Sequence, residues 1–206
     1  MTAIMTGPVG RPYFDARLHQ YRYEGRIVPS VTQIMRPLTD TAYRGIDPAT
    51  LADAADFGTA VHAATEYLDE GVLDESTLQP EWVPYVDAYK DWKRLMGPRI
   101  LQVETRLACQ RFAGTIDRIV GFDKDPETLW VVDLKTTSVL HPHVGVQLAA
   151  YVALASAIYP GRKWRRAALQ LKPSGFEFRE YTDLSDETCF VALLGIYHWG
   201  KKHASK

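Results

Sequence analysis

The middle of the chain reads as β-strands, whereas the segments before it read as helices. Apolar residues alternate or run together over residues 99–109, 111–122 and 129–137, which is typical of strands. Over residues 48–69 and 81–95 they recur at helical spacing instead. Three strands in succession predict an antiparallel meander whose faces must be covered by helices.

After the meander, the pattern predicts a helix, a pair of strands and a last helix. Residues 144–159 form the first of these helices, residues 164–172 and 176–182 pair across a short turn, and the last helix begins near Ser185. This order of elements predicts an α/β protein with a mixed central β-sheet flanked by helices.

An N-terminal hairpin and a short helix are predicted ahead of the long helices. The alternating segments within residues 19–30 meet at Glu24 and Gly25, a pair that suits a hairpin turn. Ser30 suits the N-cap of a short helix directly after it, which Pro37 is expected to help end.

Length and composition exclude several classes of protein. At 206 residues, 46% of them hydrophobic and 24% charged, the chain suits one soluble domain with a core. It has no run of about 18 apolar residues, so no membrane span is predicted, and its first residues do not read as a secretion signal. Cys109 and Cys189 lack metal-ligand spacing. We therefore expect a protein of the reducing cytoplasm.

Two acids are predicted to face each other in the meander. The turn over residues 123–127 centres on Asp125, and pairing that is symmetric about this residue places Asp117 opposite Asp133. Opposed residues have Cβ atoms about 4.5–5.5 Å apart, where like charges are destabilising. A divalent cation such as Mg²⁺ turns this repulsion into a binding site, because it prefers carboxylate oxygens.

A lysine is expected beside these acids. The two-residue period of a strand puts Asp133 and Lys135 on one face and Leu134 on the other. Glu104, on the preceding strand, would join them as an outer or second-metal carboxylate if that strand borders the hairpin. Taken alone, the Asp-Leu-Lys triplet is explained more simply by a structural ion pair.

Two other patterns have structural explanations as well as functional ones. A basic stripe over residues 162–172 suits a solvated strand edge more simply than a nucleic-acid surface, and the net charge of −1 does not decide between them. Four aromatic residues at helical spacing suit the core, although one or two could stack on single-stranded bases. These four are Trp82, Tyr85, Tyr89 and Trp92.

Four short motifs, GTAVH, GTID, DLK and QLAAY, stand in order within residues 58–151, on a helix, two strands and a helix. Together they resemble the PD-(D/E)XK nuclease superfamily, in particular its RecB-like branch, which shows G-x-x-x-H, G-x-x-D, (D/E)-x-K and Q-x-x-x-Y on the same kinds of element. The preceding PSVTQIM is similar to the entry helix of phage nucleases and mitochondrial genome maintenance exonucleases of this branch. The matching residues are Gly58, His62, Gly114, Asp117, Asp133, Lys135, Gln147 and Tyr151.

The chain departs from this pattern in two respects. Asp133 stands where glutamate is commoner, although the RecB-like pattern tolerates aspartate. Some relatives hold an iron–sulfur cluster on four cysteines, and this chain has two cysteines, so we expect no such cluster. The sequence also has no phosphate-binding loop of the G-x-x-x-x-G-K-(S/T) type, so we expect no helicase activity.

The resemblance implies a restriction-endonuclease-like core in a single domain over residues 1–206. Residues 1–97 would form the N-terminal hairpin and helical extension, residues 98–182 the catalytic sheet with its motif helix, and residues 183–206 the C-terminal helix. The implied function is that of a Mg²⁺- or Mn²⁺-dependent deoxyribonuclease, expected to be an exonuclease, in phage or bacterial DNA recombination, repair or degradation. DNA is the expected partner, and a single-strand annealing or binding protein is a further candidate.

The residues and the resemblance together predict a metal centre. Asp117 and Asp133 would hold a divalent ion, and Lys135 would orient the attacking water or stabilise the developing negative charge. The resemblance adds the main-chain carbonyl of Leu134 and the imidazole of His62 as ligands, which suits Mn²⁺ as well as Mg²⁺.

The remaining motif residues are expected to support this centre. Gly58 serves helix–sheet packing more simply than a close approach of DNA, and His62 has an alternative partner in Glu66, four residues further along its helix. Gln147 and Tyr151 share one helical face, where they would brace the active site or contact the DNA backbone. The supporting positions are Gly58, Gly114, Thr136, Gln147 and Tyr151.

Two other functions remain open at this point. One is a catalytically inactive module with a nuclease fold that binds DNA or a protein; the mutually repelling acids disfavour it. The other is a zinc hydrolase that uses His62, His141 and His143, although the proline between the last two favours an ordinary loop at the start of a helix.

Overall fold

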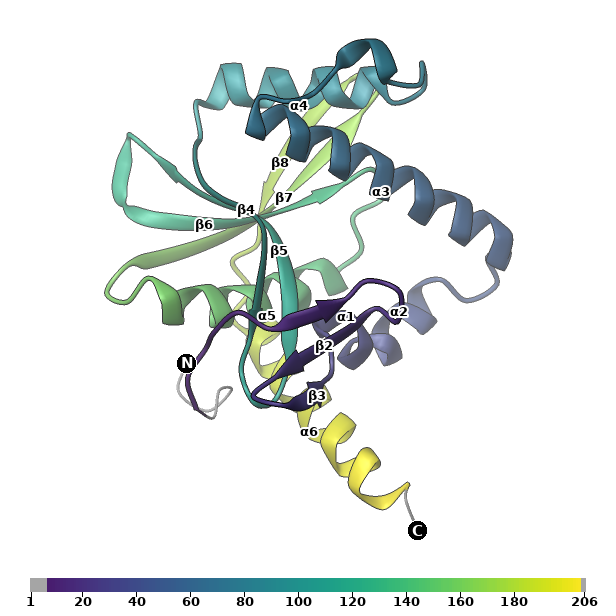
Figure 1. Cartoon of the computed structure of the whole chain (residues 1–206), viewed down its shortest axis with the longest axis vertical. Helices are drawn as coiled ribbons and strands as arrows, with labels where there is room; N and C mark the ends of the chain where they lie inside the picture. The colour runs from purple at the N-terminus through teal and green to yellow at the C-terminus, as the bar shows by residue number, and fades with distance from the viewer. Residues whose placement is uncertain (1–6, 205–206) are drawn as a thin grey trace.

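A five-stranded sheet forms the centre of the computed structural model, which describes residues 7–204 (Figure 1). Strands β4, β5 and β6 form the predicted antiparallel meander, β7 joins β6 in parallel, and β8 pairs antiparallel with β7. The sheet is therefore mixed, as predicted. Its strands, in spatial order, are β4 (Arg99–Ala108), β5 (Ala113–Phe122), β6 (Asp125–Lys135), β7 (Lys163–Lys172) and β8 (Gly175–Glu180).

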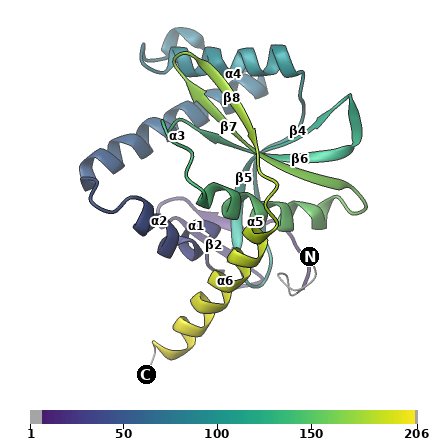
Figure 2. The ribbon, with the colours of Figure 1, turned by 180° about the vertical axis from the view of Figure 1, so that it is seen from behind.

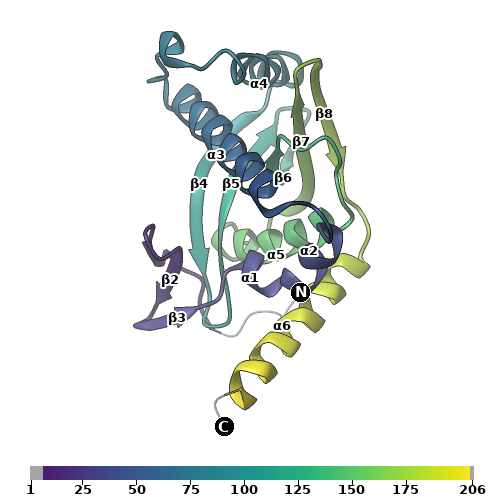
Figure 3. The ribbon, with the colours of Figure 1, turned by 90° about the vertical axis from the view of Figure 1, so that its right-hand side faces the viewer.

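Helices cover both faces of this sheet, because neighbouring residues of its strands point in opposite directions. Val132 and Leu134 of β6 pack beneath α3 (Pro48–Glu70) and α4 (Val83–Met96). Val131 packs instead in the core formed with α5 (His143–Ile158) and α6 (Ser185–His203). Figures 2 and 3 show α3 and α5 on opposite sides of the central sheet.

Helix α5 is the most deeply buried helix, and it provides the crossover between the parallel strands β6 and β7. Eleven of its residues are buried, because the sheet covers one side and α6 another. A helix that is apolar all round is expected in such a position. A polar side chain on this helix, such as that of Gln147, therefore needs a specific polar partner.

The N-terminal segment forms a second sheet and two short helices. The predicted hairpin is present as β2 (Gln20–Tyr23) and β3 (Arg26–Val28), and β1 (Tyr13–Asp15), which was not predicted, adds a third strand. Ser30 caps α1 (Val31–Ile34) as predicted: its hydroxyl accepts from Gln33 N, and its own N–H donates to Gln33 Oε1, both at 3.0 Å. This reciprocal pair is a capping box.

One prediction about this region was wrong. Pro37 does not help to end the short helix, which stops at Ile34. Pro37 instead lies in the first turn of a further helix, α2 (Arg36–Ala42), where its missing N–H has no helical partner to lose. A 3₁₀ turn (Glu75–Thr77) then links α3 to α4. Helix α4 ends at Met96 and is capped by Gly97, whose positive φ of 60° suits glycine.

The turn between β5 and β6 is tighter than predicted. Phe122 pairs with Asp125, so the turn consists of residues 123 and 124 rather than 123–127. An irregularity between Gly121 and Phe122 absorbs the difference, and further along the hairpin Arg118 faces Val132, as the predicted register requires. The register was therefore correct, although the shape of the turn was not.

The aromatic residues of α4 belong to the core. Tyr89 and Trp92 are fully buried, and Trp82 and Tyr85 pack against the same cluster. The basic stripe was expected at a strand edge, and this was wrong. Nearly all of it lies on β7, which is an interior strand between β6 and β8. Three of its cations, Lys163, Arg165 and Lys172, pair with acids of neighbouring segments.

Two general features complete the fold. Within residues 7–204, no helix is long and apolar enough to cross a lipid bilayer. Cys109 and Cys189 are both free thiols. The expectation of no secretion signal depends partly on residues 1–6, which lie outside the described residues.

Candidate active site

A cleft of about 670 Å³ gathers all the residues that the motifs predicted. It lies between the N-terminal sheet, the middle of α3, the start of β5, the end of β6 and the start of α5. Segments distant in the sequence therefore meet at one place. The predicted residues that line it are Gly58, His62, Glu104, Gly114, Asp117, Asp133, Leu134, Lys135, Thr136, Gln147 and Tyr151.

Two buried aspartates form the floor of the cleft. Asp117 and Asp133 are only 8% and 2% exposed, and Asp117 Oδ2 accepts a hydrogen bond of 2.7 Å from the main-chain N–H of Leu134. Burial raises the pKa of Asp133; Lys135 opposes this effect and the charge of Asp117 adds to it. Oδ2 of Asp133 is buried without a hydrogen-bond partner, although Lys135 Nζ lies 2.5 Å away in an ion pair.

Glu104 joins the aspartates from the edge strand β4. Val103 pairs with Arg118 and Thr105 with Ile116, so Glu104 lies opposite Asp117. Its φ of 43° is uncommon for a residue other than glycine, and such a backbone costs on the order of 1–3 kcal/mol. Burial, followed by the charge of Asp117, raises the pKa of Glu104 to about 8.

The imidazole of His62 closes the site from α3. Its Nε2 lies 3.1 Å from the main-chain oxygen of Leu134, and its Nδ1 lies 3.6 Å from Oδ2 of Asp117. The ring therefore faces the two strands that carry the acids. The alternative partner Glu66 is not needed to explain its position.

These donors suit a hard divalent cation. One ligand atom from each of His62, Glu104 and Asp117 lies within 4.8 Å of the other two, and within residues 7–204 this is the single group of three or more such side chains that could hold an ion. Asp133, which is ion-paired with Lys135, and Leu134 line the same cleft. Oxygen-rich sites with one imidazole fit Mg²⁺ or Mn²⁺.

The histidines required for a zinc hydrolase do not meet in the structure. His141 and His143 stack on each other, with ring centroids 5.4 Å apart, and Tyr43 lies edge-on to both. Neither belongs to the group formed around His62. The zinc interpretation is therefore wrong on geometric grounds.

A polar chain runs from Lys135 into α5. Lys135 Nζ donates to Gln147 Oε1 at 3.3 Å, and Gln147 Nε2 donates to the hydroxyl of Tyr151 at 3.0 Å. Burial alone would lower the pKa of Lys135, but the charges of Asp133 and Asp117 outweigh it, and the pKa is raised. Lys135 is thus a cation, and its position is set by residues of α5.

The motif glycines make room for neighbouring side chains. A Cβ atom at Gly114 would lie 2.6 Å from Cε1 of Tyr151, well inside contact distance. A Cβ atom at Gly58 would lie 3.3 Å from Oγ1 of Thr136, so α3 approaches the end of β6 closely. Helix–sheet packing, the simpler of the two explanations, accounts for both.

Behind the acids lies a polar network that the sequence interpretation missed. The fully buried Arg118 donates to the main-chain oxygen of Asp117 at 2.7 Å and lies 3.4 Å from Oε1 of Glu104. Its Nε donates to Asp69 at 2.7 Å, and Lys93 donates to the other oxygen of Asp69 at 2.6 Å. An arginine within an apolar strand was the available signal, because arginine is buried only with partners.

Comparisons with known proteins agree with this arrangement. The family model of the PD-(D/E)XK nuclease superfamily matches residues 78–187, just over half of the chain. The chain therefore belongs to the PD-(D/E)XK nuclease superfamily. The match includes Asp117, Asp133 and Lys135, whereas Gly58 and His62 precede it.

Other comparisons add less. No curated protein sequence matches significantly. One similar solved structure, described as the crystal structure of SSO0001, has a TM-score of 0.41 and 17% sequence identity over 87% of this chain and 78% of that chain. Membership of the superfamily, together with the metal-binding geometry, indicates a nuclease that depends on a divalent metal and has DNA as its substrate.

Proposed function

We propose that the protein is a Mg²⁺- or Mn²⁺-dependent DNA exonuclease of the RecB-like branch. The observation that carries the proposal is the group of three converging carboxyl groups, Glu104, Asp117 and Asp133, beside the ammonium group of Lys135. Burial and neighbouring charges raise the pKa values of Glu104 and Asp133. In their charged form such acids destabilise the fold unless a cation binds them. Such strain is expected at functional sites.

The residues in the cleft have separate tasks in this proposal. His62, Glu104, Asp117, Asp133 and the carbonyl of Leu134 would hold the metal ion. When bound, the ion would neutralise the phosphate and lower the pKa of a water molecule. The donor set in the cleft supports this assignment, because it combines carboxylate oxygens with one imidazole and one main-chain oxygen.

Lys135 is the cation that we assign to the reacting phosphate. Its raised pKa keeps it charged, and it can donate to the oxygen on which negative charge develops. Gln147 Oε1 accepts a hydrogen bond from Lys135 Nζ, and Gln147 Nε2 donates to the hydroxyl of Tyr151, so these two are positioning residues. Arg106, exposed on the wall of the cleft above Phe14, offers a further contact for the DNA backbone.

The narrower features of the proposal rest on the motif resemblance. The order of the four motifs supports the RecB-like branch, and that branch supports exonuclease activity in phage or bacterial DNA recombination, repair or degradation. A single-strand annealing or binding protein is the partner we propose. The free thiols of Cys109 and Cys189 are compatible with the bacterial or host cytoplasm as its location.

Digestion of end-labelled linear DNA and of closed circular DNA, with Mg²⁺ and with Mn²⁺, tests the function. We expect nucleotides to be released from the linear DNA alone, and Asp133→Asn to reduce the rate at least about a hundredfold. Asp91→Asn, which alters a half-exposed acid on α4 that pairs with Arg94, serves as the matched variant and should cleave normally. Cleavage of circles would contradict an exonuclease. Absence of cleavage of every substrate with both metals would favour the inactive binding module.

A further inference from the structure

A second cavity adjoins the catalytic cleft. Its volume is about 240 Å³, and it shares Thr32, Lys135, Thr137 and Gln147 with the cleft. Helices α1 and α2, the loop after β6 and the start of α5 form its walls. Because Lys135 lines both spaces, this cavity begins where the reacting phosphate would lie.

One wall of the cavity is aromatic. The rings of His141 and His143 lie nearly parallel, with 9° between their planes. The ring of Tyr43 meets them edge-on, with centroid distances of 5.3 and 5.8 Å. All three side chains are half-buried, so they present ring surface to the cavity while remaining accessible to a ligand. We name these three residues the aromatic wall.

Charge in this cavity is low. Lys135 is the single acidic or basic side chain other than the two histidines along its lining. Burial lowers the pKa of His143, and the charges of His141 and Lys135 add to this effect. A neutral imidazole offers a flat face and a hydrogen-bonding edge, which suits an uncharged planar ligand.

We infer that the aromatic wall stacks on the base of the nucleotide next to the scissile phosphate, and that this base must be unpaired. The inference rests on the proposed nuclease function and narrows its substrate to single-stranded DNA or frayed ends. Base–aromatic stacking tolerates any sequence, because every base has a π-face. A base held in a duplex cannot enter such a pocket without leaving its stack.

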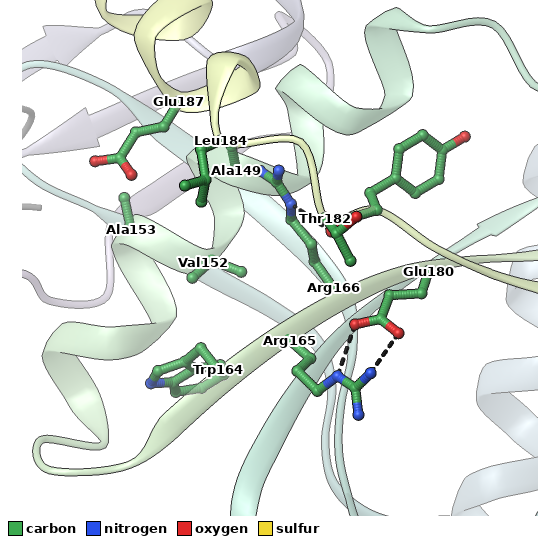
Figure 4. Close-up of a pocket in the computed structure, with 11 residues that line it drawn as sticks. Ala149, Val152, Ala153, Trp164, Arg165, Arg166, Glu180, Thr182, Leu184 and Glu187 are labelled. Atoms are coloured by element: carbon green, nitrogen blue, oxygen red, sulfur yellow. Dashed lines mark hydrogen bonds and ion pairs between the residues drawn. The ribbon is translucent and has the colours of Figure 1, made fainter.

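A cavity of similar volume elsewhere lacks these properties. It lies between α5, β7 and the start of α6 (Figure 4). Its floor is apolar, and its charged groups already pair: Arg165 with Glu180, as the dashed lines in Figure 4 show, and Arg166 with Asp186. It does not include Lys135, so it has no connection to the chemistry proposed for the cleft.

Steady-state kinetics on single-stranded and blunt duplex DNA test the inference. We expect Tyr43→Ala and His141→Ala to raise KM for single-stranded DNA roughly ten- to a hundredfold and to change kcat less than about threefold. Tyr43→Phe, which keeps the ring, should retain normal KM. Tyr67→Ala alters a half-exposed tyrosine on α3 and should have no effect. Melting temperatures close to that of the native protein would show that the variants fold.

A binding measurement separates this inference from the proposed function. In the Asp133→Asn background, an oligonucleotide with a terminal 2-aminopurine should lose fluorescence on binding with Ca²⁺, and Tyr43→Ala should abolish that loss. If the native protein cleaves DNA but prefers blunt duplex, or if Tyr43→Ala leaves both KM and the fluorescence change intact, the stacking pocket is wrong and the nuclease stands. If no DNA is cleaved, the proposed nuclease function is wrong, and the fluorescence change alone then tests the inferred stacking pocket.

Discussion

The candidate active-site cleft and the β7–β8 hairpin both carry charged side chains on adjacent strands, but the two regions differ in how these charges are paired and how far they are exposed. On the hairpin, Arg165 pairs with Glu180 and Lys172 with Glu177, and these side chains are between 29% and 51% exposed. Each of these four side chains has one partner of opposite charge at the surface. Such pairs contribute little to stability, typically below about 1 kcal/mol.

In the cleft, acids outnumber cations and are less exposed, with exposed side-chain fractions of 21% for Glu104, 11% for Asp117 and 2% for Asp133. Glu104, Asp117 and Asp133 share Lys135 on the open side and Arg118 behind. Burial and mutual repulsion raise the pKa values of Glu104 and Asp133. Matched, exposed charge therefore indicates a structural surface, whereas an excess of buried acid indicates a site that needs a cation.

The largest expected effect is on stability, at the buried arginine behind the acids. Arg118→Met removes the fully buried cation that pairs with Asp69 and Glu104 and leaves Asp69 with Lys93 alone, so we expect the free energy of unfolding to fall by about 3–5 kcal/mol. Arg165→Met on the hairpin should cost less than about 1 kcal/mol. Urea denaturation at neutral pH measures both, and equal losses would remove the distinction between the two regions.

The next effect is on catalysis. Lys135→Met should reduce kcat at least about a hundredfold, because it removes the cation assigned to the developing negative charge. Lys163→Met removes an exposed lysine that pairs with Glu127 at 3.3 Å, and it should leave kcat within about twofold. Single-turnover cleavage of end-labelled DNA compares the two variants; a similar kcat in both would exclude Lys135 from the chemistry.

A smaller effect concerns metal binding and pH. With its pKa raised from an ordinary value of 4.5 to about 8, Glu104 is protonated at neutral pH in the metal-free protein, so a metal ion must displace that proton. Affinity for Mg²⁺ should therefore weaken about tenfold for each pH unit below this pKa. Isothermal titration across pH measures the slope. Glu104→Gln should make the Mg²⁺ affinity less dependent on pH, whereas Glu81→Gln, at an exposed acid, should leave the slope unchanged.

The raised pKa of Glu104 also predicts how the stability of the metal-free protein depends on pH. A carboxyl group whose pKa is higher in the folded state stabilises the fold fully at pH values below its ordinary pKa, and that contribution is lost as the pH rises through the folded value. The metal-free protein should thus melt at a lower temperature at pH 8.5 than at pH 6, and Mg²⁺ should raise the melting temperature more at pH 8.5. A Mg²⁺ shift that is larger at pH 6 would contradict the assignment of Glu104.

The smallest effect is expected on the hairpin. Glu177→Gln breaks an exposed pair with Lys172, 3.1 Å apart, and should lower the free energy of unfolding by less than about 1 kcal/mol. Its nuclease activity should be unchanged. Urea denaturation at low and high salt checks this prediction, since salt screens an exposed pair and should reduce the difference further.

Local patterns in the sequence were sufficient to predict most of the elements. The helical period located α3 and α4, the strand period located the meander, and Ser30 marked a helix start through hydrogen bonds to its near neighbours. The register that places Asp117 across from Asp133 also followed from the sequence, because in a hairpin pairing depends on a short turn. Short elements with weak patterns, such as β1 and α2, were missed.

By itself the sequence determined which elements form, and which short motifs carry the acids and the lysine of the cleft. Only the tertiary structure decided that Glu104 bends towards Asp117, that Arg118 reaches Asp69, and that Tyr43 meets His141 and His143. The physical reason is that periodicity reports contacts with solvent and near neighbours along the chain. Contacts between side chains on distant segments depend instead on how the sheet, the helices and the loops pack together.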